Sequence, residues 1–461
     1  MYIKLIQPKM KKRPMDTDLK THMSPPLGLY TIANMLRGKH IVTVENENVE
    51  RIELHDRPDA VGISVTVDTL PRAMKISAFF RRRGIPVIAG GIFVTTAREF
   101  IPKGAFDALC VGAAELTWQD IVKDLERGEL KPLYRCERPL RGEDIISPAY
   151  DMIRRDNYLY CNIIHTSRGC PYRCDFCYNS SPERQYVCRP IDDVIRDIRA
   201  AGSRHIMFID DNFTGNRAWL REFLDRIEPM GLIWNAAASI DIADDIGLLE
   251  KMRSCGCQSL FIGFESVNRR SLRGVHKVQN DPESFDEAVK IIHSCGLMIN
   301  ASFVFGLDSD TPRVFRDTVD WIVRNRIETV TSHILTPYPG TKLYDEMKRD
   351  GRIFTHDLSL YNTANVVFKP LKMTPQELYR GYLQVYRSVY SFGNIIRRMP
   401  GERSQVMPYL LFNIFYRKFG SFTDGLCRAA GYNNMGRIAA ILSYSRRGKQ
   451  RKKLTARKYG R

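Results

Sequence analysis

Three cysteines lie within eight positions of the stretch SRGCPYRCDFCYNSS, with the spacing Cys170-x3-Cys174-x2-Cys177. A structural zinc site normally takes four ligands in two pairs, and no second pair follows here, because Cys188 stands alone eleven residues on. Three close thiolates suit a [4Fe–4S] cluster in which one iron keeps an open position for a substrate or cofactor. The spacing therefore favours an iron–sulfur site over a zinc site.

Residues 161–350 contain the elements that must position these cysteines. Expected strands alternate with helical stretches six times, which predicts a (β/α) barrel or partial barrel. The strands are expected at 162–167, 205–210, 233–239, 259–266, 298–306 and 329–335. Active sites of such barrels gather at the C-terminal ends of the strands, and the cysteines directly follow the first strand. Their position therefore supports a chemical role.

Residues 1–130 alternate short apolar strands with helices, which is typical of a doubly wound parallel sheet. Strands are expected at 2–7, 40–44, 59–65, 86–91 and 107–112. Ligands of such sheets bind beyond the strand ends, where glycine lets a backbone approach closely. The candidate residues there are Ser64, Gly90, Gly91 and Gly112. For any single glycine, a plain strand-to-turn transition is an alternative explanation.

Three further segments complete the expected organisation. Residues 131–160 are rich in Arg, Pro and Asp and are expected to form a linker, and residues 351–445 are expected to be helical. Within the latter, PYLLFNIFYRKFG (408–420) can pack on the barrel or lie on a membrane surface. Residues 446–461 carry nine Lys or Arg and no acid, half of the net charge of +18. We expect a disordered tail, with anionic lipid or nucleic acid as alternative contacts.

Composition narrows the class of protein. The chain of 461 residues suits two domains plus an appendage, and no apolar run reaches the roughly 18 residues of a membrane span. The N-terminal stretch lacks the apolar core of a signal peptide, and eleven cysteines at uneven spacing do not indicate disulfides. We therefore expect a cytoplasmic protein with reduced thiols, with peripheral membrane contact through the basic C-terminus as a further option.

The motif CxxxCxxC, with the aromatic Phe176 before its last cysteine, is similar to that of the radical S-adenosylmethionine (radical SAM) superfamily. The resemblance implies that Cys170, Cys174 and Cys177 hold a [4Fe–4S] cluster and that its open iron chelates SAM. An external donor such as flavodoxin or ferredoxin would supply one electron. SAM would then be cleaved to methionine and a 5′-deoxyadenosyl radical, which abstracts hydrogen from an unactivated C–H bond.

The same resemblance implies SAM contacts at the ends of the later strands. The run Asp210-Asp211-Asn212 would lie near the SAM amino group, Glu265 near the ribose and Lys277 near the carboxylate. A helix cap explains one member of that run but not all three, and a lysine is often merely solvated. The predicted set is Phe176, Asp210, Asp211, Asn212, Ser239, Glu265, Lys277 and Ser302.

The N-terminal domain resembles the cobalamin-binding subclass of this superfamily. The resemblance rests on residues 24–36, 58–65, 87–96 and 107–117. It implies cobalamin contacts by Ser64, Gly90, Gly91, Gly112 and Glu115.

Two departures from the cobalamin pattern leave binding open. The histidines before residue 150 are His22, His40 and His55, and none fits an Asp-x-His-x-x-Gly motif. The loop at 112–115 reads Gly-Ala-Ala-Glu where the subclass usually has a Gly-Glu-Gly-Glu-like sequence. A domain that has kept its shape but lost cobalamin is therefore an alternative.

The segments DDNFTGN, IGFES, HKVQN and MTPQELYRGY resemble enzymes that act on lipids and apolar natural products, such as the hopanoid C-methylases. The resemblance implies methyl transfer from methylcobalamin to an unactivated carbon of a lipid or natural product, with a second SAM remethylating the cobalt. One alternative is a radical SAM cyclase or rearrangement enzyme that does not methylate, with or without cobalamin. An RNA-modifying enzyme is disfavoured, because methylthiolating relatives carry three further N-terminal cysteines and only Cys110 precedes residue 136 here.

Overall fold

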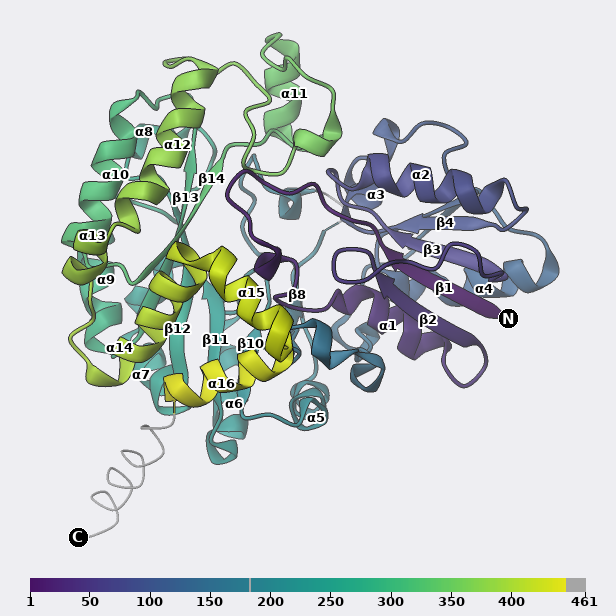
Figure 1. Cartoon of the computed structure of the whole chain (residues 1–461), viewed down its shortest axis with the longest axis horizontal. Helices are drawn as coiled ribbons and strands as arrows, with labels where there is room; N and C mark the ends of the chain where they lie inside the picture. The colour runs from purple at the N-terminus through teal and green to yellow at the C-terminus, as the bar shows by residue number, and fades with distance from the viewer. Residues whose placement is uncertain (182–183, 445–461) are drawn as a thin grey trace.

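The computed structural model describes residues 1–181 and 184–444, which form two α/β units and a helical C-terminal region (Figure 1). The predicted basic tail, 446–461, lies outside the described residues. The α/β class and the barrel expected from the sequence are confirmed.

The N-terminal unit is a six-stranded parallel sheet with the order β2-β1-β3-β4-β5-β6. The chain leaves β1 toward β2 and then returns to β3 on its other side, so the topological switch point lies between β1 and β3. The strands are β1 (Tyr2–Gln7), β2 (Ile41–Asn46), β3 (Ala60–Ser64), β4 (Val87–Gly90), β5 (Ala108–Val111) and β6 (Leu133–Arg135). The helices are α1 (Leu27–Leu36), α2 (Leu70–Arg81), α3 (Ile92–Thr96) and α4 (Trp118–Arg127).

Strand β6 lies inside the segment that the sequence predicts to be a linker. Only its middle residue, Tyr134, is buried, while Leu133 and Arg135 are exposed. A three-residue strand with one buried side chain has too little periodicity to stand out in the sequence. The segment 131–160 therefore extends the first sheet as well as connecting the two units.

The second unit is a partial barrel of six parallel strands in the order β14-β13-β12-β11-β10-β7, and within the described residues no pairing joins β14 to β7. Its strands are β7 (Ile163–Ile164), β10 (His205–Phe208), β11 (Ile233–Ala238), β12 (Cys257–Glu265), β13 (Met298–Phe305) and β14 (Thr329–Ile334). Its helices are α5 (Ile191–Ala201), α6 (Arg217–Ile227), α7 (Ile246–Ser254), α8 (Arg269–Arg273), α9 (Phe285–Ser294), α10 (Arg313–Arg324) and α11 (Lys342–Arg349). A short hairpin of β8 (Ser167–Arg168) and β9 (Val187–Cys188) follows β7.

The C-terminal helices cover the open side of the barrel (Figure 1). They are α12 (Pro375–Val389), α13 (Phe392–Arg397), α14 (Arg403–Leu410), the π-helical segment η11 (Leu411–Lys418), α15 (Gly420–Ala430) and α16 (Tyr432–Tyr444). Helix α12 begins at a capping box of Thr374 and Glu377, with Pro375 at its first position. No helix in the described ranges combines the length and the apolar character needed to cross a bilayer.

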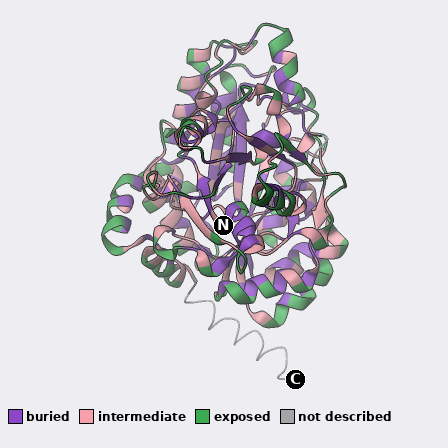
Figure 2. Cartoon of the chain, turned by 90° about the vertical axis from the view of Figure 1, so that its right-hand side faces the viewer, coloured by how far each residue is buried: buried purple, intermediate pink, exposed green. Residues whose placement is uncertain are grey.

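One hydrophobic core joins the two units. It runs from Ile63 and Val65 in the first sheet to Trp234 and Ile262 in the barrel, all at most 2% exposed. Figure 2 shows these buried strands at the centre of the molecule, under a more exposed layer of helices. Because the core is continuous, the two units are held in a fixed relation.

Two tyrosines of α12 cap the free edge of the barrel sheet. The Tyr386 hydroxyl accepts a hydrogen bond from the Ser332 N–H (2.9 Å) and donates to the Ser332 carbonyl (3.1 Å). The Tyr390 hydroxyl does the same for Val330, at 3.0 and 2.6 Å. The four residues from Tyr386 to Tyr390 rise about 6 Å along a helix, close to the roughly 6.6 Å between alternate strand residues. The hydroxyls therefore replace a missing neighbouring strand.

Removing either hydroxyl is expected to destabilise the protein. Tyr386→Phe or Tyr390→Phe leaves a buried backbone N–H and carbonyl of β14 without their partner, at a cost of about 1–3 kcal/mol each. Thermal unfolding followed by circular dichroism measures the effect. Tyr379→Phe, on the same helix but without such a bond to β14, is the control and should unfold like the wild type. Equal melting of all three variants would contradict the edge-capping role.

Candidate active site between the two α/β units

The predicted cluster cysteines lie on the loop between β8 and β9. These strands pair Ser167 with Cys188, so the loop closes on itself as a hairpin. Gly169 has φ +79°, and a Cβ there would collide with the Gln185 carbonyl, so the close approach of the two arms requires glycine. The Cys177 N–H donates to the Cys174 carbonyl at 3.0 Å, which forms a tight turn between the last two cysteines.

Side-chain amides from two other loops approach two of the three thiols. Asn212 Nδ2 lies 3.9 Å from Cys170 Sγ, and Gln279 Nε2 lies 3.8 Å from Cys174 Sγ. Burial raises the pKa of the Cys177 thiol to about 11. Across the ranges described, no three His, Cys, Asp or Glu side chains are grouped as ligands of one metal ion.

Asp210 has a different set of contacts from the one predicted. Its carboxylate is 4% exposed and accepts four hydrogen bonds, from the backbone N–H and the hydroxyl of both Thr166 and Ser167, at 2.5–3.0 Å. These bonds occupy both oxygens and tie the end of β10 to the start of the cluster loop. We infer that Asp210 anchors this loop, and its direct contact with SAM stays an unsupported prediction.

The other two residues of the Asp-Asp-Asn run, Asp211 and Asn212, point in different directions. Asn212 Nδ2 also donates to Ser239 Oγ at 3.1 Å, so Asn212 bridges the ends of β10 and β11 beside Cys170. The Asp211 side chain is 42% exposed and pairs with Arg184 at 3.1 Å. The structure therefore brings Asn212 and Ser239 together at the cluster loop and leaves Asp211 at its outer edge.

Glu265 and Lys277, which the sequence predicts as separate SAM contacts, form an ion pair of 2.6 Å with both side chains about 10% exposed. Glu265 ends β12 at φ +62°, next to a register shift in the β12–β13 pairing. Asn280 Nδ2 holds this bend by donating to the carbonyls of Gly263 and Phe264 at 2.8 and 2.9 Å. A left-handed non-glycine residue costs about 1–3 kcal/mol and concentrates at functional sites.

Several buried polar atoms beside the cluster loop suit a polar ligand. The Tyr178 hydroxyl, Gln279 Oε1 and Asn280 Oδ1 have no hydrogen-bond partner within the described chain. Buried polar atoms are normally paired, so a ligand rich in polar groups, such as SAM, fits here. The motif HKVQN contains Gln279 and Asn280, but only the fold brings their side chains to the cluster loop. Ser302 lies beside Gly263 in the sheet register, and Phe176 packs against the core.

Asp175, inside the cysteine motif, ties the cluster loop to two distant segments. Its carboxylate lies 2.6 Å from His276 Nδ1 and 3.0 Å from Lys342 Nζ. Its N–H donates to the Val275 carbonyl at 3.2 Å. Asp175 was not predicted as a site residue, because its partners lie about a hundred or more positions away in the sequence.

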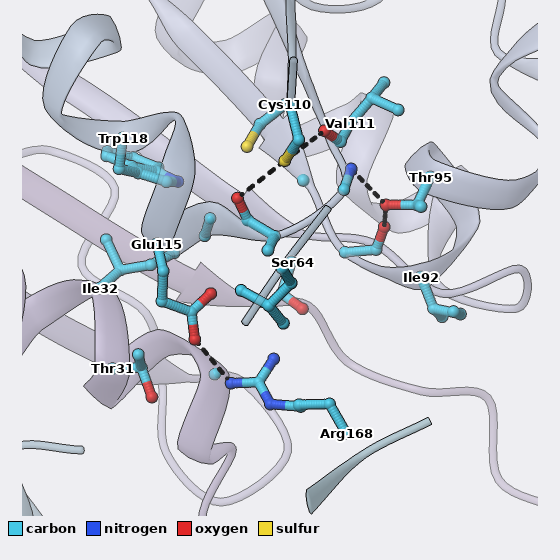
Figure 3. Close-up of a pocket in the computed structure, with 18 of the residues that line it drawn as sticks. Thr31, Ile32, Ser64, Ile92, Thr95, Cys110, Val111, Glu115, Trp118 and Arg168 are labelled. Atoms are coloured by element: carbon cyan, nitrogen blue, oxygen red, sulfur yellow. Dashed lines mark hydrogen bonds and ion pairs between the residues drawn. The ribbon is translucent and has the colours of Figure 1, made fainter. Parts of the chain in front are cut away.

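A cavity of about 470 Å³ lies at the switch point of the first sheet (Figure 3). Its wall includes all five residues predicted for cobalamin, namely Ser64, Gly90, Gly91, Gly112 and Glu115. Arg168, Arg184 and Gln185 of the β8–β9 hairpin line the same cavity. Glu115 is nearly fully buried and pairs with Arg168 across the two units at 2.8 Å (Figure 3).

The glycines that line this cavity are explained in two different ways, by close packing within the fold or by space left for a ligand. A Cβ at Gly91 would come within 2.9 Å of the Val65 backbone, and one at Gly112 within 2.8 Å of Cys136 Sγ, so the fold itself requires both. Gly28, in the first turn of α1, lines the cavity, and none of the described atoms lies within 4 Å of the position its Cβ would take. A bound group can therefore approach the α1 backbone there. Because the cavity combines this open backbone with apolar walls at the switch point, it fits part of a cobalamin.

Comparison with known protein families agrees with this geometry. The sequence model of the radical SAM superfamily matches residues 164–322, and that of the B12-binding domain matches residues 21–122. The chain belongs to the radical SAM superfamily. A domain of unknown function matches residues 341–409. A radical SAM domain uses SAM and a [4Fe–4S] cluster and a B12-binding domain binds cobalamin, so the predicted cofactors are confirmed.

The curated relatives of this radical SAM enzyme include C-methyltransferases, and anaerobic magnesium-protoporphyrin IX monomethyl ester cyclases are more distant relatives. The chain is 28% identical to bacteriochlorophyllide d C-12(1)-methyltransferase of Chlorobaculum tepidum, over 90% of this chain and 93% of the relative. It is 29% identical to hopanoid C-2 methylase of Rhodopseudomonas palustris, over 75% and 68%. Among solved structures, the methyltransferase TsrM of Kitasatospora setae, with cobalamin and a [4Fe–4S] cluster bound, shares the fold at TM-score 0.66, with 14% identity over 95% of this chain and 99% of TsrM.

Proposed function

We propose that this enzyme transfers a methyl group to an unactivated carbon of an apolar small molecule. The observation that carries the proposal is that the loop with the cluster cysteines also forms part of the wall of the predicted cobalamin cavity. Arg168 lies two residues before Cys170 and also lines the cavity of the B12-binding domain. A radical formed at the cluster and a methyl group held at the cavity would therefore act on one substrate between them.

The residues of the chain supply binding and positioning for this reaction. Bound cobalamin would carry the methyl group, and the cluster with SAM would supply the radical that opens the C–H bond. Cys170, Cys174 and Cys177 would hold the cluster, and the Glu265–Lys277 pair would orient SAM. The hairpin that carries the cysteines also contributes Arg168, Arg184 and Gln185 to the wall of the cavity.

The substrate class is inferred from the relatives and from the aromatic C-terminal region. The two curated relatives act, by their names, on a bacteriochlorophyllide and on a hopanoid, which are both large ring systems. We infer a substrate of this kind, with the electron supplied by an external donor such as flavodoxin or ferredoxin.

Anaerobic turnover with methyl-labelled SAM tests the function. The reconstituted protein, loaded with hydroxocobalamin and given a reductant, should form 5′-deoxyadenosine and move the label into a ring-containing substrate such as bacteriochlorophyllide d. Deoxyadenosine without a labelled product from any ring compound tested would favour cyclisation or rearrangement. Absence of deoxyadenosine would contradict radical chemistry altogether.

We also propose that the C-terminal helices contact an anionic membrane surface. A surface that we call the C-terminal apolar surface consists of the exposed side chains Phe392, Ile396, Met407, Phe415, Phe419, Phe422, Leu426, Ile438, Ile441 and Leu442. Exposed basic residues lie among them at positions 397, 403, 418, 428 and 437, and the sequence that follows α16 adds nine Lys or Arg without an acid. Apolar side chains mixed with basic ones match a bilayer with anionic headgroups.

Vesicle flotation tests the membrane contact. Burying one large apolar side chain contributes about 1.5–3 kcal/mol, so Phe422→Ser with Leu426→Ser should weaken binding to phosphatidylglycerol-rich vesicles by roughly tenfold or more. The control is Ile41→Ser, a 70% exposed residue on β2, which should bind like the wild type. Equal binding of the wild type to pure phosphatidylcholine vesicles, or no binding at all, would contradict the proposal.

A further inference from the structure

The inner face of the barrel keeps accessible side chains although helices cover the outside. Phe261, in the middle of β12, is 38% exposed, while its neighbour Ile262 is fully buried under the helices. On the same inner face, Asn300, Thr331 and His333 are only half-buried. These side chains line the inside of the barrel, and we call the space that they border the barrel chamber.

The barrel chamber extends from the predicted SAM site across β12, β13 and β14. Gly263, Ser302 and Thr331 lie side by side on β12, β13 and β14. Gly263 adjoins the Glu265–Lys277 pair, since a Cβ there would lie 3.0 Å from Lys277 Nζ. Neighbouring strands are about 4.8 Å apart, so Thr331 lies about 10 Å from the SAM end of this row.

Arg417 of η11 closes the chamber beyond Thr331. Its Nη2 donates to Thr331 Oγ1 at 3.3 Å. Its guanidinium lies 5.1–5.8 Å from the ring centroids of four aromatic residues, which are Tyr386, Tyr390, Phe412 and Tyr416. Within residues 1–181 and 184–444, no carboxylate forms an ion pair with it, and its Nε has no hydrogen-bond partner, as is also true of the Nε of Arg189 and Arg398.

Two arginines that are buried more deeply than the half-buried Arg417 have more hydrogen-bond partners. Arg189 pairs with Asp197 at 2.7 Å, and Arg398 donates four hydrogen bonds to three backbone carbonyls and to Asn413. His333, near Arg417, does not add charge, because burial and the nearby Arg13 and Arg417 lower its pKa to about 3. Arg417 is thus a cation that only aromatic rings and one hydroxyl stabilise.

Even a partly buried cation without a counter-charge is costly, and aromatic faces offset only part of that cost. A carboxylate that enters the chamber would complete the hydrogen bonding of the planar guanidinium, which matches a carboxylate in two-point geometry. The surrounding tyrosine and phenylalanine rings would meanwhile contact an apolar body. The site is therefore built for one negative charge at the end of an aromatic pocket.

We propose that Arg417 binds a carboxylate of the substrate and thereby orients it in the barrel chamber. This inference rests on the proposed function for the identity of the chamber as the substrate site. It predicts that the substrate is an apolar ring compound that carries an acid group at its end away from the predicted SAM site. It favours an acidic substrate such as a chlorophyllide over a neutral hopanoid.

Equilibrium binding of matched acid and ester probes tests the proposal. The probes are bacteriochlorophyllide d and pyrenebutyric acid, each compared with its methyl ester, and the readout is fluorescence of the anaerobic holoenzyme. The wild type should bind at least one acid about tenfold or more tightly than its ester. Arg417→Gln should remove this preference, and Arg417→Lys, which keeps the charge, should restore part of it.

A neighbouring lysine provides the matched control. Lys418→Gln removes an exposed charge from the same helical turn, which lies over Phe392 and not in the chamber, and should keep the preference for the acid. Circular dichroism and the iron and cobalt content of each variant show that it is folded and loaded. Equal binding of acid and ester by the wild type, no binding of either acid, or a preference that survives in Arg417→Gln would overturn the proposal.

The outcome is separable from the proposed function. A wild type that prefers the acid but transfers no labelled methyl group would support the site and contradict the methyltransferase assignment. A wild type that methylates a ring compound without distinguishing acid from ester would support the methyltransferase assignment and contradict the carboxylate site.

Discussion

Replacing Cys170, Cys174 or Cys177 by alanine is expected to abolish 5′-deoxyadenosine formation. A [4Fe–4S] cluster with three protein ligands cannot be held stably by two, and without it no electron reaches SAM. The loop itself should survive, because Asp210, Gly169 and the β8–β9 pairing hold it independently of the thiols. The measurement is deoxyadenosine by chromatography after anaerobic reconstitution, together with the iron content of each variant.

Cys188→Ala is the matched control for the cluster variants. Cys188 lies on β9 of the same hairpin, is half-buried, and donates to the Tyr186 hydroxyl at 3.5 Å. It should retain about the iron and deoxyadenosine formation of the wild type. Turnover that persists in Cys170→Ala, or that is lost equally in Cys188→Ala, would refute the assignment of the three cluster ligands.

Substituting leucine for Gly28 is expected to block cobalamin binding and with it methyl transfer. Gly28 lines the cavity with open space at its Cβ position, so the added side chain would occupy volume that the cofactor needs. Overpacking a fitted site costs typically about 1–3 kcal/mol, which weakens affinity by roughly 5- to 150-fold. Cobalt retained after gel filtration and label transfer from methyl-labelled SAM measure the loss, and the iron content should stay unchanged.

Gly247→Leu separates cavity blocking from a helix effect. Gly247 is also the second residue of its helix, α7, and none of the described atoms lies within 4 Å of its Cβ position either. It lies outside the residues that line the cavity, so its leucine variant should bind cobalamin normally. Gly28→Ala, with a smaller side chain, should give an intermediate loss. Full cobalt retention by Gly28→Leu would exclude this cavity as the cobalamin site.

The cysteine spacing and the strand pattern carried most of the fold and cofactor assignment. Strands β1, β3 and β4 are buried along most of their length and form continuous apolar runs, whereas β11 and β14 alternate buried and half-buried residues, and both patterns can be located from the sequence. β6 could not, because one buried tyrosine among exposed residues gives no pattern. The cluster motif could also be recognised from the sequence, because its three cysteine ligands are close together in the chain.

The roles of individual polar residues depended on the tertiary structure. Glu265 and Lys277 were predicted separately, and only the register shift at the end of β12 brings them into one ion pair. Asp210 matched the expected motif, yet its carboxylate is saturated by Thr166 and Ser167. Sequence spacing predicts which residues share a strand end, but not which partner each side chain reaches.

Arg417 shows most clearly what the sequence alone does not predict. In the sequence it is one of 70 lysines and arginines, in a stretch that could equally pack on the barrel or lie on a membrane. Its aromatic neighbours come from α12 and η11, and its hydroxyl partner is Thr331 of β14. The sequence alone determined the cofactor chemistry, because that depends on local ligand spacing. The tertiary structure decided which charges are compensated, because compensation depends on contacts between segments distant in the chain.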